Sequence, residues 1–231
     1  GLVGSEMCIR DRRMACEVRA VADRVPAGDA VHGRECIYDL RLQGAPYFRG
    51  AAHNLGVYGL AQPTLLGLKS VLSLLGCQPN SQSGRQCVWV CTREEPVIYV
   101  GDRPFVLREA HKPTHTFSLS DRAENLEAIE KRLRDDVLLE SQRNGGMLLV
   151  HEEEEGNEQL VPTWVAVQRN EVRTVREVWK QVQSDGWQVV YHRLPIAQDQ
   201  PLEHNYLDAY TQGIKESDPR QTFFVANCGA G

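Results

Sequence analysis

Apolar residues recur at helical spacing in several stretches of the chain, and each stretch is bounded by residues that start or stop a helix. Positions 65–75 carry leucines three and four residues apart, the spacing of one helix face. Pro63 suits the first position of that helix, and Gly76 suits the left-handed position after its end. Further helices are predicted over the segments 121–141, 174–185 and 205–215.

Short apolar runs lie between these helical stretches and predict strands. Residues 87–91 form a continuous apolar run, which is typical of a strand covered on both faces. Residues 97–100 and 104–107 flank a Gly-Asp pair, which predicts a hairpin with a tight turn. Residues 109–119 are predicted to form a loop. Other strands are predicted at 147–151, 161–167, 187–194 and 222–227.

The alternation of strands and helices predicts the fold class. It favours an α/β fold with a largely parallel central sheet, helices on both faces and one added β-hairpin. Sites in such sheets lie beyond the carboxyl ends of the strands. Three segments are expected at that edge: 93–95, 195–200 and 228–231.

Composition narrows the class of protein. The chain has 231 residues, which suggests one domain, with a net charge of −5 that does not favour a nucleic-acid surface. No apolar run is close to the length of about 18 residues that a transmembrane helix needs. The seven cysteines form no C-x-x-C pair. Reduced thiols and a cytoplasmic location are therefore expected.

Three regions with different organisation are expected along the chain. Residues 1–13 show no regular spacing of apolar residues and are predicted to be a non-native leader, which is not expected to belong to the fold. Residues 14–43 are weakly patterned and predicted to be a weakly ordered segment. Residues 44–231 are predicted to form one domain that is incomplete at its C-terminal end.

The last strand leads into Cys228, which Gly229, Ala230 and Gly231 follow. Cysteine-dependent phosphatase chemistry needs a thiolate nucleophile, amide groups and an Arg that bind the phosphoryl oxygens, and a general acid. Cys228 can supply the thiolate, and the glycines permit a tight anion-binding turn. The Arg of the usual pattern would lie at the sixth position after Cys228, beyond Gly231. By spacing alone, a cysteine after a strand is more often a core residue.

A set of ordered segments adds a family resemblance. The chain resembles the repeat unit of the paladin family, whose repeats belong to the cysteine-phosphatase superfamily and are similar to bacterial cysteine phytases. The resemblance covers about residues 44–228, and the segments that carry it are 44–49, 57–64, 93–99, 103–109, 145–151, 191–196 and 223–228.

The resemblance implies roles for individual residues. It implies that Cys228 is the nucleophile and that the following backbone amides bind phosphate. It places the general acid in the loop 195–200, where Gln198 occupies the expected acid position and Asp199 follows one residue late. Asp199 is therefore a candidate acid, with a solvated loop carboxylate as the alternative. Arg193 and Arg93 are candidate substrate contacts, with strand-end or ion-pair roles as the alternatives.

The function implied is that of a fragment of a paladin-like phosphatase. It would hydrolyse phosphomonoesters, such as phosphotyrosine or inositol phosphates, through a cysteinyl-phosphate intermediate. No metal or other cofactor is expected, because amides and Arg stabilise the charge. The expected partners are a phosphorylated small molecule or phosphoprotein and further repeats in a parent chain. The chain itself is expected to be inactive without the loop Arg. The alternative is a non-catalytic pseudophosphatase repeat that binds phosphate or acts as a scaffold.

Overall fold

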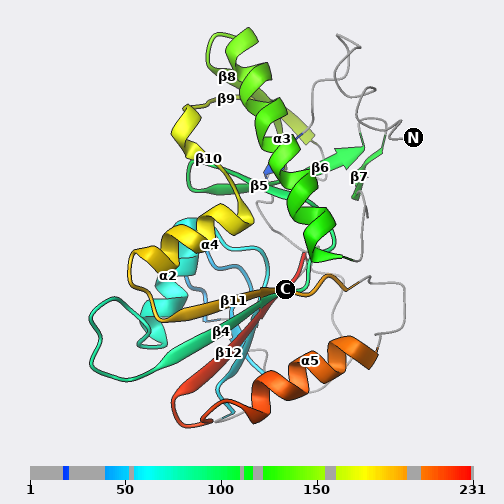
Figure 1. Cartoon of the computed structure of the whole chain (residues 1–231). Coiled ribbons are helices and arrows are strands. Elements are labelled where there is room, and N and C mark those ends of the chain that lie inside the picture. The colour runs from blue at the N-terminus through cyan, green and yellow to red at the C-terminus, as the bar shows by residue number, and fades with distance from the viewer. Residues whose placement is uncertain are drawn as a thin grey trace. The chain divides into compact units, whose positions relative to one another are not determined.

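The elements of the chain fall into two compact units, each built on its own sheet (Figure 1). The structure is a computed structural model. It describes residues 18–20, 40–51, 55–109, 112–116, 122–153, 160–196 and 204–229. We call the unit that contains residues 40–94 and 177–229 the parallel-sheet unit, and the unit that contains residues 18–20, 95–116 and 124–176 the antiparallel-sheet unit.

The parallel-sheet unit has a five-stranded sheet in the order β11-β4-β12-β3-β2. Its strands are β2 (Arg49–Gly50), β3 (Val57–Leu60), β4 (Gln86–Cys91), β11 (Val189–Arg193) and β12 (Thr222–Asn227). Strands β11, β4, β12 and β3 run parallel to one another, and β2 pairs antiparallel at the edge. The predicted α/β class with a largely parallel, helix-flanked sheet is confirmed.

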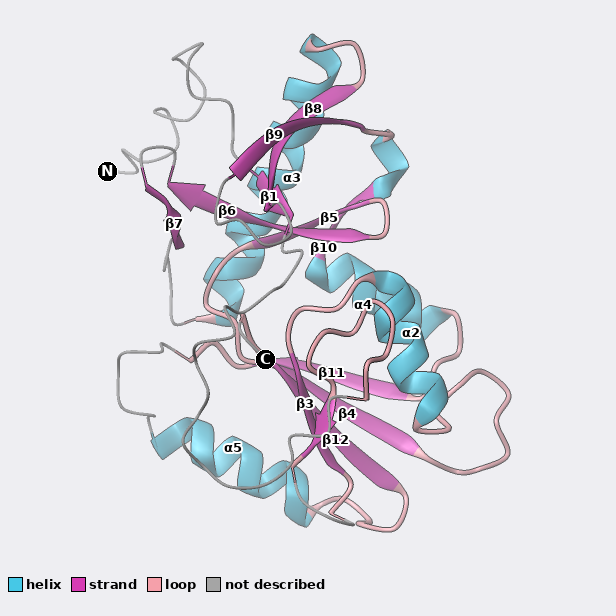
Figure 2. Cartoon of the chain, turned by 180° about the vertical axis from the view of Figure 1, so that it is seen from behind, coloured by secondary structure: helices cyan, strands magenta, loops and turns pink. Residues whose placement is uncertain are grey.

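Helices cover both faces of this sheet. They are α2 (Leu65–Leu74), α4 (Val175–Ser184) and α5 (His204–Lys215). Figures 1 and 2 show α2 and α4 on one face of the sheet and α5 on the other. Aromatic stacking fixes α4 against the strands, since the Trp179 ring lies 4.9 Å from the Trp89 ring and 4.9 Å from the Tyr191 ring. Trp89 is fully buried, as the continuous apolar run around it predicted.

Helix α2 begins and ends at specific capping residues. Thr64 is the N-cap and its hydroxyl accepts a hydrogen bond of 3.1 Å from the Gly67 N–H, so Pro63 lies before the cap and its predicted place at the first helical position is wrong. At the other end Gly76 has a φ of +77°. The Cys77 N–H donates to the Leu72 carbonyl at 2.9 Å, which completes a Schellman motif. The predicted helix stop at Gly76 is confirmed.

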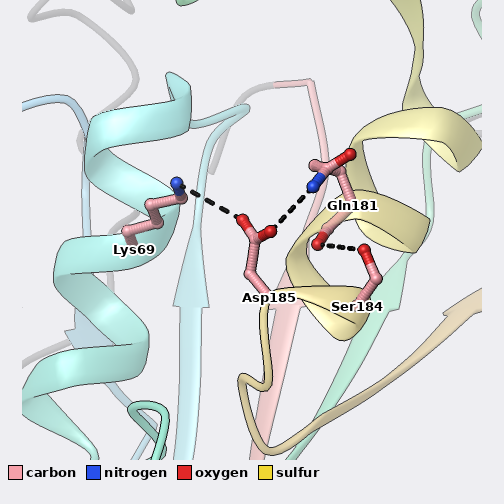
Figure 3. A network of polar contacts seen from close by, with 4 residues as sticks. All are labelled: Lys69, Gln181, Ser184 and Asp185. Carbon is pink, nitrogen blue, oxygen red and sulfur yellow. Dashed lines mark hydrogen bonds and ion pairs between the residues drawn. The ribbon is translucent and has the colours of Figure 1, made fainter.

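A polar network joins α2 to the C-terminal end of α4 (Figure 3). The Lys69 ammonium lies 3.9 Å from the Asp185 carboxylate, which also accepts a hydrogen bond of 2.7 Å from the Gln181 amide. Both charged side chains are well exposed, so water screens their attraction. The network therefore orients surface groups and contributes little to stability.

The antiparallel-sheet unit has a seven-stranded sheet whose main path is β10-β5-β6-β1-β8-β9, with β7 paired to β6. All its strand pairs are antiparallel except β1 with β8. The strands are β1 (Val18–Ala20), β5 (Val97–Val100), β6 (Arg103–Glu109), β7 (Lys112–Thr116), β8 (Met147–Glu153), β9 (Leu160–Ala166) and β10 (Val172–Thr174). The predicted hairpin is confirmed as β5–β6, but it belongs to a second sheet.

Helix α3 (Ala123–Arg143) packs on this second sheet, and a single 3-10 turn, η1 (Arg169–Glu171), precedes β10. The fully buried Glu130 of α3 accepts a hydrogen bond of 2.9 Å from the Val97 N–H at the start of β5. The loop predicted over 109–119 is wrong at Lys112–Thr116, because that polar segment pairs with β6 as an outer strand. No helix in the described part of the chain is both long and apolar enough to cross a bilayer.

Candidate functional site

Four parallel strands of the parallel-sheet unit end in register at one edge of their sheet (Figure 2). Asn227 at the end of β12 lies opposite Leu60 of β3 on one side and Cys91 of β4 on the other. Cys91 in turn lies opposite Arg193, the last residue of β11. The segments that follow these strands therefore leave the sheet at the same edge, as predicted from the alternation of strands and helices.

Hydrogen bonds connect these departing segments. The Thr92 N–H and hydroxyl both donate to the Asn227 carbonyl, at 2.8 Å and 3.1 Å. The Thr92 carbonyl accepts from the Ile196 N–H at 3.0 Å, and the Leu194 N–H donates to the Cys91 carbonyl at 2.9 Å. The start of the segment predicted to carry the acid is therefore held to the end of the strand that precedes Cys228.

Cys228 is the first residue after β12, and its N–H donates to the Leu60 carbonyl at 3.3 Å. Among the cysteines in the described part of the chain it alone is partly exposed, whereas Cys77, Cys87 and Cys91 are buried. Burial raises the pKa of Cys77 to about 11, despite the opposing charge of Arg85. Burial, and then the neighbouring Cys77, raise the pKa of Cys87. These core thiols are poor nucleophiles at neutral pH, because only the thiolate attacks.

A buried polar cluster surrounds the residue that precedes Cys228. The Trp89 indole N–H donates to the Asn227 side-chain oxygen at 2.8 Å, and the Asn227 amide group donates to the Gln62 side-chain oxygen at 3.0 Å. All three side chains are buried. We did not predict this cluster from the sequence. The one local signal was a polar Asn at the end of an otherwise apolar strand, directly before the cysteine.

Two arginines predicted as substrate contacts lie at the same edge. Arg93 and Arg193 are both buried, with 3% and 6% of their surface exposed. The Arg193 guanidinium donates to the Arg93 carbonyl at 3.4 Å. Two positively charged groups are thus held within the unit that carries Cys228. Their roles toward a substrate stay a prediction.

Other predicted site residues fall outside the described part of the chain. Asp199 and Gln198 of the candidate acid loop are among them, as are Ala230 and Gly231. Gly229 is described and directly follows Cys228. Within the described residues, no group of three or more His, Cys, Asp or Glu side chains is arranged to hold a metal ion. The acid role of Asp199 and the phosphate-binding role of the loop amides stay predictions.

Comparison with known proteins identifies the family. The family model for PTP-like phytases, described as "Inositol hexakisphosphate", matches residues 90–231, which include the end of β4, all of β11 and β12, and Cys228. The chain belongs to the PTP-like phytase family. It is also 32% identical over 183 residues to paladin of Xenopus tropicalis, an alignment that covers 75% of this chain and 20% of that protein. The resemblance to paladin repeats is confirmed, and the chain spans about a fifth of the length of that relative.

Solved structures of the PTP-like phytase family have the same fold. The tandemly repeated protein tyrosine phosphatase like phytase from Mitsuokella multacida matches with a TM-score of 0.56 and 18% identity, over 77% of this chain and 27% of that chain. The PTP-like myo-inositol phosphatase from the same organism, solved with myo-inositol-(1,3,4,5)-tetrakisphosphate, matches with a TM-score of 0.56 and 16% identity. That alignment covers 94% of this chain and 31% of that one. A phosphatase-like fold is therefore shown.

Proposed function

We propose that the edge of the parallel sheet at Cys228 is the site of a cysteine-dependent phosphatase that hydrolyses phosphomonoesters. The observation that carries this proposal is the position of Cys228. It is a partly exposed thiol that directly follows the central strand β12 and precedes a glycine, in a chain of the PTP-like phytase family. Oriented amides at such a strand end favour an anion.

The proposed reaction has two steps. The Cys228 thiolate attacks phosphorus, the bond from phosphorus to the leaving oxygen breaks, and a general acid protonates that oxygen. Water then attacks the cysteinyl phosphate, which releases inorganic phosphate and restores the thiolate. The backbone amides of Gly229, Ala230 and Gly231 stabilise the charge on the phosphoryl oxygens.

Asp199 is the proposed general acid. Glutamine does not donate a proton usefully at neutral pH, so Gln198 cannot take this role, and the neighbouring carboxyl group of Asp199 is the candidate. The hydrogen bond from Ile196 to Thr92 holds the start of this loop to the strand end beside Cys228. This hydrogen bond supports the proposal, because the loop that carries Asp199 starts at the same sheet edge as Cys228.

Inositol phosphates are the proposed substrates, with phosphotyrosine as the second class. A structural relative was solved with an inositol tetrakisphosphate, and such a ligand carries several dianionic groups. Arg93 and Arg193 supply fixed positive charge in the unit that carries Cys228, which suits a polyanion.

Thiol labelling of the complete protein tests this proposal. Iodoacetate at mildly acidic pH should modify Cys228 selectively, and inorganic phosphate should slow that modification. Cys77 is the internal control, because it is buried and its pKa is raised to about 11. Peptide mapping reports each thiol separately. Labelling of Cys228 that is no faster than labelling of Cys77, or that phosphate does not slow, would contradict the proposal.

A second candidate is a non-catalytic module that binds phosphate or acts as a scaffold. Gln198 at the expected acid position favours it. The two candidates differ in one result. Phosphate protection of Cys228 together with hydrolysis of an inositol phosphate supports the enzyme, whereas protection without any hydrolysis supports the binding module.

A further inference from the structure

Asn227 is held by several hydrogen bonds at the candidate site. Its side-chain oxygen accepts from the Trp89 indole, and its side-chain amide donates to Gln62. Its carbonyl accepts from both the N–H and the hydroxyl of Thr92. It is 2% exposed. Every polar group of its side chain and its carbonyl is therefore committed to a contact within the protein.

The partners of Asn227 come from separate parts of the sheet. Gln62 lies just after β3, Trp89 lies within β4, and Asn227 ends β12 between those two strands. Asn227 is separated from Trp89 by 138 residues and from Gln62 by 165 residues. A short amide side chain thus bridges both neighbouring strands at the point where the chain leaves the sheet toward Cys228.

Trp89 is itself immobilised on its other side. Its ring packs 4.9 Å from that of Trp179, whose ring stacks on Tyr191 at an interplanar angle of 14°. The indole cannot turn without disturbing this aromatic stack, so its N–H is a fixed donor. The Asn227 amide orientation is consequently set by the core of the unit rather than by solvent.

We propose that Asn227 is a positioning residue, which sets the direction of the Cys228 thiol through its hydrogen bonds to Trp89 and Gln62. The inference rests on the proposed function, because it concerns how Cys228 meets an anion. A buried polar cluster of this kind is costly when only part of it is satisfied. Such a cluster therefore fixes one geometry at the strand end and disfavours alternatives.

The test compares two alkylating reagents at one thiol in the complete protein. Iodoacetate is an anion and iodoacetamide is neutral, so the ratio of their rates at Cys228 reports attraction of an anion and cancels simple exposure. We expect the wild-type ratio to exceed that of free cysteine several-fold. Asn227→Leu keeps the number and branching of the side-chain heavy atoms and removes both side-chain hydrogen bonds. It should lower the ratio several-fold, to about that of free cysteine, since small displacements at reacting groups are enough to remove such an effect.

Two further variants separate positioning from stability. Gln62→Met removes the acceptor for the Asn227 amide but keeps the hydrogen bond from Trp89 to Asn227. It should also lower the ratio, and it serves as the test if Asn227→Leu does not fold. Val189→Ala removes buried apolar volume at the opposite end of β11, so it destabilises the same unit without touching the cluster. It should leave the ratio within about twofold, since it changes no contact that positions the thiol.

The outcomes distinguish this inference from the proposed function. A wild-type ratio equal to that of free cysteine contradicts the proposed function and this inference with it. A raised wild-type ratio that survives in both Asn227→Leu and Gln62→Met overturns the inference alone. An equal fall in Val189→Ala also overturns it, because loss of stability would then explain the effect.

Discussion

Replacing Gly67 by Ala should destabilise the parallel-sheet unit, although the same change usually stabilises a helix. Gly67 lies in the first turn of α2, where a turn of the chain at Gly44 crosses it. A Cβ atom on Gly67 would lie 1.9 Å from the Gly44 carbonyl oxygen and 2.7 Å from the Ala45 nitrogen. Both atoms belong to the backbone, so the crossing segments must move apart.

The magnitude follows from three contributions. Ala is favoured over Gly in a helix by about 1 kcal/mol. Forcing a methyl group into packed backbone costs roughly 1–3 kcal/mol. Separation of the segments also weakens the hydrogen bond of 2.8 Å from the Thr64 N–H to the Gly44 carbonyl, which costs about 1 kcal/mol of unfolding free energy. The net expected loss of unfolding free energy is about 1–3 kcal/mol.

Urea unfolding followed by tryptophan fluorescence measures this change. Gly213→Ala is a matched control, because Gly213 lies in α5 and a Cβ there would meet nothing within 4 Å. The free energy of unfolding of that variant should rise by up to about 1 kcal/mol. The two substitutions are therefore expected to change the free energy of unfolding in opposite directions. If Gly67→Ala is as stable as the wild-type protein or more so, the close approach of the two backbones is refuted.

Three other predictions concern chemistry and charge. Asp199→Asn in the complete protein should lower turnover most on alkyl phosphates, which have poor leaving groups; an equal loss on p-nitrophenyl phosphate would argue against an acid role. Burial raises the pKa of Cys77 from 9.0 to about 11 and also raises the pKa of Cys87, so these thiols lose their protons at a lower pH in the unfolded chain than in the folded protein. As a result, the free energy of unfolding should stay constant below about pH 9 and fall between about pH 9 and 11. Urea titrations at several pH values that show no fall would contradict this. Lys69→Met should lower the midpoint of a thermal scan by no more than about 2–4 °C, because its contact with Asp185 is exposed and worth about 0–1 kcal/mol; a larger fall would contradict this.

Local signals predicted much of the fold. The leucine spacing of 65–75 and the glycine after it set the limits of α2, because a helix is stabilised by contacts three and four residues apart. The second sheet was not predicted, because its strand pairs join distant segments such as β1 with β6 and β8. Strand β7 was missed because its sequence, Lys-Pro-Thr-His-Thr, offers no apolar run.

The candidate site was predictable in position but not in its supporting contacts. Strand ends can be located from apolar runs, and the parallel arrangement brings Arg93, Arg193 and Cys228 to one edge. The hydrogen bonds of Asn227 to Trp89 and Gln62 could not be predicted, because they depend on strand order and register. Sequence spacing carries no information about partners separated by 138 and 165 residues.

Capture of a phosphorylated enzyme tests most directly whether Cys228 is the nucleophile. The complete protein would be mixed with an inositol phosphate, quenched in acid and digested, and the peptide that contains Cys228 weighed by mass spectrometry. We predict a phosphoryl group on Cys228, and a fall in turnover of roughly a thousandfold or more in Cys228→Ser. Hydrolysis that persists in Cys228→Ser, or a phosphoryl group on another residue, would contradict the proposed function.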